Sequence, residues 1–267
     1  MIDSHVHLNR HEFQGQQDEV LTRAREAGIT KFLNVGYDLE SSAESIALAE
    51  THDDILATVG VHPHDAALLA DAQGEPTAEA PALLDKLRTM AKNPKVIAIG
   101  EIGLDFFRDL SPRPAQYAAL KMQLEIASEL DLPVVFHIRD AWSETLAFVD
   151  DFGIPARRGI LHAFSGDDAS VEWARKNSFL LGIGGPVTYK NSNLDSLVAQ
   201  AGAEMILLET DAPWLPPVPF RGQRNESAYL VHTRDRVAAA LELEADEVDR
   251  ITTENFNRLF DGGSLVS

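Results

Sequence analysis

The stretch Pro133–Val134–Val135–Phe136–His137 is an unbroken apolar run that stops at a histidine. A short run of this kind, without polar alternation, is typical of a parallel strand that is buried on both faces. Other runs have the same character, and we expect a strand in each: Met1–Ser4, Lys31–Val35, Ile55–Val61, Val96–Gly100, Gly159–Leu161, Phe179–Ile183 and Met205–Leu208. Most are followed by a polar loop, so the chain repeats a unit in which an apolar strand ends in reactive side chains.

Segments with helical spacing of apolar residues lie between the expected strands. They are Gln16–Ala27, Glu40–Glu50, Ala82–Ala91, Pro114–Leu130, Ser143–Asp150, Asp168–Lys176, Leu194–Ala201 and Ala228–Leu241, and Asp246–Phe260 adds a closing C-terminal helix. Eight alternations of strand and helix in about 250 residues predict an α/β fold, the (β/α)8 TIM barrel. A doubly wound open sheet is the alternative, because strand order is not visible in a sequence. We expect residues 1–267 to form a single domain.

Composition narrows the class of protein further. The chain is 45% hydrophobic and has no cysteine, so any metal must be held by imidazole and carboxylate groups. No apolar stretch approaches the roughly 18 residues of a membrane span, and the N-terminus does not resemble a secretory signal. We therefore expect a cytoplasmic protein without a membrane partner. The formal net charge of −19 excludes tight binding of duplex DNA through a broad basic face.

Six residues that can bind a divalent cation recur where the expected strands stop: His5, His7, Glu101, His137, His162 and Asp211. Residues two apart on a strand point the same way, so His5 and His7 would aim at one place. Each residue alone has a simpler interpretation, such as a core histidine, a salt bridge or a turn aspartate. The joint pattern outweighs these, because active sites of such barrels lie at the carboxyl ends of the strands.

Four imidazoles and two carboxylates exceed what one catalytic cation needs if it is to keep a position for water. We therefore expect two divalent cations (Mg, Mn or Zn), with Glu101 bridging them. A second His-x-His pair is expected to contact substrate through His64 and to give a supporting role to His62. Of the arginines near the expected barrel mouth, Arg139 and Arg224 are predicted to bind phosphate. The alternative is that these arginines are solvated or paired with acids.

Several motifs together resemble the TatD family of metal-dependent deoxyribonucleases. They are Ile2–Leu8 (IDSHVHL), Gly60–His64 (GVHPH), Ile99–Asp105 (IGEIGLD), Phe136–Asp140 (FHIRD), Leu161–Gly166 (LHAFSG), Leu208–Pro213 (LETDAP), Pro219–Asn225 (PFRGQRN) and Asn255–Phe260 (NFNRLF). The resemblance implies a barrel of the amidohydrolase-like superfamily with two divalent metals. It implies that His5, His7 and Asp211 hold one cation, that His137 and His162 hold the other, and that Glu101 bridges. The acidic segment Asp71–Pro81 departs from the family pattern, and we expect it to be a surface insertion near the site that narrows the substrate range.

The resulting hypothesis is a divalent-metal-dependent hydrolase that cleaves phosphodiester bonds of DNA, with a 3′–5′ exodeoxyribonuclease favoured by the resemblance. Two cations would activate the attacking water, and Asp211 would accept its proton. The expected substrate is the end of single-stranded DNA, bound weakly and locally. Two alternatives stay open: an amidohydrolase or lactonase acting on a small molecule, and a catalytically silent metal-binding scaffold.

Overall fold

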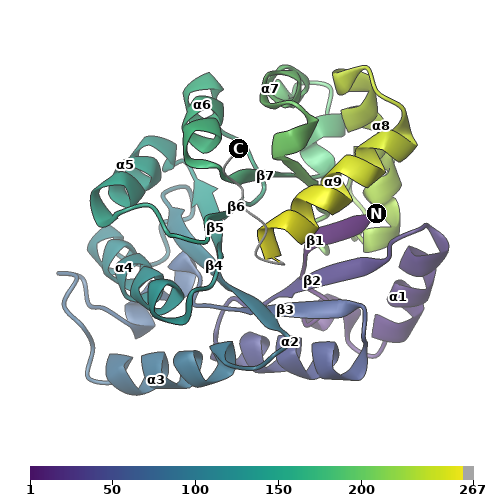
Figure 1. Ribbon diagram of the computed structural model, residues 1–267. Coiled ribbons are helices and arrows are strands. Elements are labelled where there is room, and N and C mark those ends of the chain that lie inside the picture. Colours follow the sequence, from purple (N-terminus) through teal and green to yellow (C-terminus); the bar gives the residue numbers. More distant parts are fainter. Residues whose placement is uncertain (261–267) are drawn as a thin grey trace. The chain divides into compact units, whose positions relative to one another are not determined.

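The computed structural model describes residues 1–260, so the last residues of the expected domain, 261–267, lie outside the described part. Within the described chain, eight strands alternate with helices (Figure 1). The strands are β1 (Ile2–Val6), β2 (Lys31–Val35), β3 (Ile55–Val59), β4 (Val96–Asp105), β5 (Val134–Arg139), β6 (Gly159–Leu161), β7 (Leu180–Ile183) and β8 (Ile206–Leu208). By contact density the chain divides into two compact units, one formed by residues 1–34 with the described residues from 162 on, the other by residues 35–161.

The helices lie close to the segments that the sequence predicts. They are α1 (Gln17–Glu26), α2 (Leu39–Thr51), α3 (Ala80–Ala91), α4 (Arg113–Leu130), α5 (Trp142–Phe152), α6 (Asp168–Asn177), α7 (Leu194–Ala201), α8 (Leu230–Leu241) and α9 (Ala245–Phe260). Local sequence fixes several of their ends. Asp38 and Ser41 form a capping box at the start of α2, and a proline stands in the first turn of α4. No helix in residues 1–260 has the length and apolarity needed to cross a membrane.

In the first unit the carboxyl ends of β1 and β8 are held side by side. The backbone N–H of Asp211 donates to the carbonyl of His5 at 2.9 Å, and that of His7 donates to the carbonyl of Ala212 at 2.9 Å. β1 also pairs in parallel with β2, and β8 pairs in parallel with β7. All five residues of β1 are buried, and α9 packs against β1 (Figure 1), which explains the absence of polar alternation in this strand.

In the second unit the order of strands is β3, β4, β5, β6, each parallel to the next. β4 runs to Asp105, five residues beyond the end that the sequence predicts, because its pairing with β5 continues through Gly103 opposite His137 and Asp105 opposite Arg139. Glu101 therefore lies inside β4 rather than immediately after it, and His137, expected as the last residue of its strand, lies inside β5. The consequence is that both side chains are mounted on a paired backbone.

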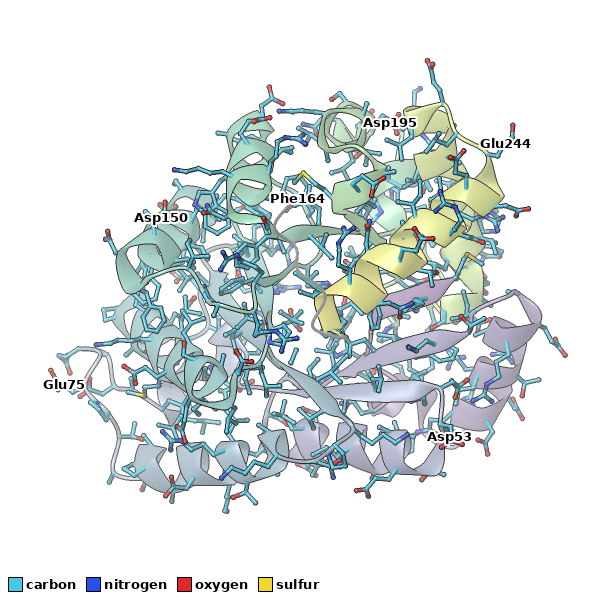
Figure 2. All side chains as sticks on the ribbon, in the orientation of Figure 1. Asp53, Glu75, Asp150, Phe164, Asp195 and Glu244 are labelled. Carbon is cyan, nitrogen blue, oxygen red and sulfur yellow. The ribbon has the colours of Figure 1, made fainter. Side chains whose placement is uncertain are left out.

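The segment Asp71–Pro81 is a loop only as far as Glu79, because α3 begins at Ala80. Its turn is closed by the carboxylate of Asp71, which accepts hydrogen bonds from the backbone N–H groups of Gln73 (2.9 Å) and Glu75 (3.0 Å). Glu75 stands exposed at the tip of the loop (Figure 2). The influence of this loop on substrate range stays a prediction.

Candidate metal centre

Three of the expected ligands meet in the first unit. Nε2 of His5 lies 3.1 Å from Nε2 of His7, and Oδ1 of Asp211 lies 3.5 Å from Nε2 of His7 and 3.9 Å from Nε2 of His5. His5 lies in β1 and His7 directly follows it, and the two side chains point the same way because residues two apart in extended backbone share a face. Asp211 reaches them because the segment after β8 is hydrogen-bonded to β1. All three donor atoms belong to one group whose members lie within 4.8 Å of one another.

His162, directly after β6, approaches the same carboxylate and forms a further possible donor group with His5 and Glu209. Its ring stacks on that of His5, with centroids 3.3 Å apart, and its Nε2 lies 3.8 Å from Oδ1 of Asp211. Nitrogens of three imidazoles thus lie within 3.9 Å of one carboxylate oxygen. Converging imidazole nitrogens around a carboxylate are the ligand set of Zn²⁺ and related divalent cations, so the residues fit a bound metal.

Charge and backbone both keep Asp211 ready to bind a cation. Burial by itself raises the pKa of its carboxyl, but the hydrogen bond from His7 and the charges of His162 and His5 lower it below the usual value. The carboxylate is therefore ionised at neutral pH. Its backbone has φ of 54°, a left-handed conformation that a non-glycine residue keeps only where the surroundings enforce it.

Those surroundings are built on Thr210, which precedes Asp211. The side chain of Asp3 accepts a hydrogen bond from the Thr210 backbone N–H at 3.0 Å and one from its hydroxyl at 2.7 Å. On the other side, the Asn225 amide donates to the Thr210 carbonyl at 2.9 Å and to the Trp214 carbonyl at 2.7 Å. Burial raises the pKa of Asp3 to about 6 despite these hydrogen bonds. The network fixes the direction in which Asp211 points.

Glu209 is a buried carboxylate of this unit that the sequence interpretation missed. Its Oε1 lies 3.0 Å from Nδ1 of His162 and accepts a hydrogen bond from the Ala163 backbone N–H at 2.7 Å. Gly182 on the neighbouring strand leaves room for this carboxylate, since a Cβ there would collide with Oε2 of Glu209. Glu209 thus orients His162, as carboxylates do for metal-binding histidines.

A second group of donors lies in the other unit and contains His62, Glu101 and His137. Oε1 of Glu101 lies 2.7 Å from Nδ1 of His137 and 3.6 Å from Nε2 of His62. Burial, and then the charge of His137, lowers the pKa of His62 to about 4. His62 is therefore neutral at physiological pH, the state in which an imidazole binds a metal. From the sequence, only a supporting role is expected for His62.

Asp105 completes this second group and is the other carboxylate that the sequence interpretation missed. Its Oδ2 lies 2.7 Å from Nε2 of His64 and 3.1 Å from Nε2 of His137, and its Oδ1 accepts hydrogen bonds from the backbone N–H groups of Phe107 and Arg108. Burial alone would raise the pKa of this carboxyl, but the hydrogen bonds from His137, Arg108 and His64 hold it well below its usual range. His64, expected to contact substrate, is thus tied to a fixed carboxylate.

The two predicted phosphate-binding arginines have different surroundings. Arg139 is exposed at the end of β5, and its guanidinium carbon lies 3.9 Å from the centre of the Phe107 ring. Arg224 donates to the Glu12 carbonyl at 2.5 Å and to Oε1 of Gln16 at 3.2 Å, so it braces the segment before α1. The guanidinium of Arg139 is on an exposed residue, whereas Arg224 is only partly exposed. For both residues, binding of phosphate stays a prediction.

Clusters of histidine and carboxylate carried by parallel strands that alternate with helices define a class of protein, the metal-dependent hydrolases. The sequence matches the family described as TatD related DNase over residues 2–261, and the chain belongs to this family. It is 34% identical over 261 residues to the "Uncharacterized metal-dependent hydrolase YabD" of Bacillus subtilis, covering 97% of this chain and 98% of that protein. It is 35% identical over 266 residues to the "3'-5' ssDNA/RNA exonuclease TatD" of Klebsiella pneumoniae, covering 97% of each.

Among solved structures, the chain resembles the TatD homologue YJJV of Escherichia coli, with a TM-score of 0.87 and 30% sequence identity over 98% of both chains. This likeness confirms the expected (β/α)8 TIM barrel, and α9 is the expected additional C-terminal helix. The protein is accordingly a hydrolase of the TatD family and a metal-dependent one.

Proposed function

We propose that the protein is a divalent-metal-dependent nuclease that removes nucleotides from the 3′ ends of single-stranded DNA. The observation that supports this most strongly is the approach of His5, His7 and His162 to the carboxylate of Asp211 in a chain of this family. A relative at 35% identity is named for 3′–5′ exonuclease activity on single-stranded DNA and RNA, which supports the same substrate class.

We assign His5, His7 and Asp211 to one divalent cation and His137 and His162 to a second, and we assign Glu101 as the ligand that would be shared by both. A cation bound there polarises a phosphoryl oxygen and lowers the pKa of a bound water towards neutrality. The carboxylate of Asp211, held ionised by His7, is the group placed to accept the proton of the attacking water. Activity after reloading with each metal in turn would identify which of Mg, Mn and Zn the protein uses.

The other residues act on the substrate. The exposed guanidinium of Arg139 would contact a phosphate oxygen, and Arg224 has the same expected role. His64, fixed by Asp105, would contact the substrate. With a net charge of −19, a polyanion must be attracted locally, by contacts of this kind and by the metal cations, which agrees with weak binding of strand ends. A single domain and a cytoplasmic location stay predictions.

The test is hydrolysis by purified protein, stripped of metal and reloaded with Mg²⁺, Mn²⁺ or Zn²⁺ in turn. Substrates would be a single-stranded DNA labelled at either end, the same sequence as RNA and as duplex, bis-p-nitrophenyl phosphate, a lactone and an amide. We expect stepwise shortening from the 3′ end of the single strand. The variant H7A should lose orders of magnitude in rate, and H11A, which alters a histidine with a 74% exposed side chain, should not. Turnover of the lactone or amide alone, or no turnover with metal bound, would refute the proposal.

A further inference from the structure

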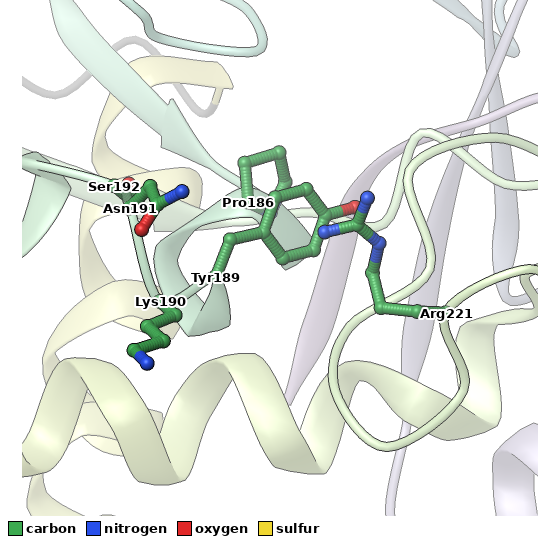
Figure 3. A pocket seen from close by; sticks show the side chains of 6 residues that line it. All are labelled: Pro186, Tyr189, Lys190, Asn191, Ser192 and Arg221. Atoms are coloured by element: carbon green, nitrogen blue, oxygen red, sulfur yellow. The ribbon is translucent and has the colours of Figure 1, made fainter.

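A pocket of about 340 Å³ opens in the first unit beside the loops that follow β7 and β8. Its lining, drawn in Figure 3, consists of Pro186, Tyr189, Lys190, Asn191, Ser192 and Arg221. Two of these six side chains are cationic, three offer a hydroxyl or an amide, and none is acidic. In a chain with 42 acidic and 23 basic residues, such a lining is unusual and suits an anion.

The two walls of the pocket are fixed to each other. The hydroxyl of Tyr189 donates to the Pro216 carbonyl at 3.0 Å, and the hydroxyl of Thr188 accepts a hydrogen bond from the Val218 backbone N–H at 2.8 Å. Gly185, in the short helix Gly185–Thr188, lies so close to the backbone of Leu215 that a Cβ could not fit between them. The pocket is therefore a preformed feature of these loops, as small-ligand sites usually are.

Arg221 forms one side of the pocket in a defined orientation. Its guanidinium carbon lies 3.8 Å from the centre of the Tyr189 ring, and the preceding residue, Phe220, is stacked on Tyr229 with ring centroids 3.8 Å apart. Stacking on an aromatic face engages the plane of a guanidinium and leaves its N–H groups directed outward at the rim. Such a fork can bind two oxygens of a phosphate at once.

The pocket also lies on the functional side of this unit. One wall follows the carboxyl end of β7 (Leu180–Ile183), and the other belongs to the loop that begins after β8 with the candidate ligand Asp211. In barrels of this class, loops after the seventh and eighth strands are frequent sites for phosphate. The same loop thus carries a metal-binding carboxylate at its start and Arg221 ten residues later.

We propose that this pocket, here called the Arg221 pocket, binds a backbone phosphate of the nucleic-acid strand at a distance from the phosphodiester that is cleaved. Arg221 and Lys190 would contact the phosphate oxygens, and Asn191 and Ser192 the neighbouring sugar. The proposal rests on the proposed nuclease function and adds to it a second anchoring point. The protein would then distinguish a polynucleotide from a small phosphodiester, because only a strand reaches both the metal-binding residues and the pocket.

The experiment compares R221A and K190A with two matched controls, R250A on α9, whose side chain is 57% exposed, and K176A on α6, which is exposed. KM and kcat would be measured for bis-p-nitrophenyl phosphate and for single strands from two nucleotides up to about 12. For the long strands we expect R221A to raise KM about ten-fold, the effect of losing one charge-assisted phosphate contact, and to reduce the salt dependence of KM. For bis-p-nitrophenyl phosphate and dinucleotides, R221A should match the wild type.

Strands that carry a single neutral methylphosphonate, moved one linkage at a time from the 3′ end, identify the phosphate concerned. One internal position should raise the KM of the wild type and leave that of R221A unchanged. Equal KM values for R221A and R250A on long strands, or a wild-type KM that no internal position changes, would overturn the Arg221 pocket while leaving the nuclease proposal intact. Absence of hydrolysis of every strand by wild-type protein would instead refute the nuclease proposal, and with it the pocket's role.

Discussion

Nδ1 of His162 lies 3.0 Å from Oε1 of Glu209, and this contact leaves Nε2 of the same ring facing Asp211 at 3.8 Å. A histidine whose one nitrogen is held by a carboxylate presents the other nitrogen to a metal in a fixed direction, with increased basicity. Glu209 is therefore expected to orient His162 towards the metal centre, and it also belongs to a possible donor group with His5 and His162. Two predictions test that role.

The variant E209Q keeps the shape of the side chain and removes its charge. We expect metal affinity at the first group of ligands to fall 10- to 100-fold, roughly the cost of losing such a partner. Competition with a chromophoric chelator measures this, and circular dichroism checks that the fold is retained. The exposed Glu204 supplies the control, since E204Q should bind metal like the wild type. Equal affinity in E209Q and the wild type would show that His162 needs no carboxylate to orient it.

Gly182 supports the same contact from β7. Substitution by alanine would place a methyl group against the Glu209 carboxylate, so G182A should cost about 1 to 3 kcal/mol of stability and weaken metal binding as well. At Gly184 a Cβ would meet only ordinary packing contacts, and G184A should be tolerated. Urea unfolding with and without metal measures both effects. If G182A and G184A unfold alike, the close approach of Glu209 to β7 does not constrain the fold.

Most of the fold is predictable from the sequence because it depends on local runs. The apolar runs that form β2 and β7 and the helical spacing of α7 are visible without tertiary information. The end of β4 is not, since Gly100, Glu101 and Gly103 interrupt the apolar run and make it look finished. Pairing with a strand some thirty residues later extends β4 to Asp105, and such distant pairing leaves no local mark.

The candidate ligands were predictable for a related reason, and their partners were not. His5, His7 and His162 stand out only together, because they recur where successive strands end and active sites of such barrels lie at those ends. Glu209 and Asp105 looked like ordinary acids, because a carboxylate is recognised as a partner only when the residue it contacts is known. The contact of the Arg224 guanidinium with the backbone of Glu12 was likewise invisible in the sequence, and its phosphate contact stays a prediction.

Asp105 holds two imidazoles of the second group, and D105N should loosen both. An amide oxygen is a weaker acceptor than an ionised carboxylate. The hydrogen bonds from His64 and His137, which lower the pKa of Asp105 in the wild type, would therefore weaken in the variant. We expect kcat on single-stranded DNA to fall by about 100-fold with a smaller change in KM. D109N alters a half-exposed aspartate nearby in the sequence and should keep wild-type kcat. A D105N protein with unchanged kcat would mean that the orientation of His64 and His137 is irrelevant to the reaction.

Glu101 tests the two-cation assignment directly. E101Q retains one neutral oxygen but loses the charge that a bridging ligand needs, so we expect bound metal to fall from two equivalents to about one and hydrolysis to fall by orders of magnitude. Metal content by mass spectrometry after gel filtration and hydrolysis of bis-p-nitrophenyl phosphate measure the two effects. E129Q, at an exposed glutamate of α4, should retain both metal and activity. A wild-type rate in E101Q would contradict the bridging role.

His62 makes the metal-free protein sensitive to acid. Because burial lowers its pKa from 6.5 to about 4, the folded state excludes a proton that the unfolded chain accepts. With respect to this group, the folded state is therefore most stable above pH 6.5. It loses about 3 kcal/mol of its free energy of unfolding as the pH falls to about 4.

Asp3, whose pKa is raised to about 6, acts in the opposite direction over the same range, so the stability of the wild type alone cannot isolate His62. The difference between wild type and H62Q removes the contribution of Asp3, which is common to both. In chelator, the free energy of unfolding of the wild type minus that of H62Q should therefore decrease by about 3 kcal/mol on acidification. A pH-independent difference for H62Q would mean that His62 is protonated as easily in the folded protein as in the unfolded one.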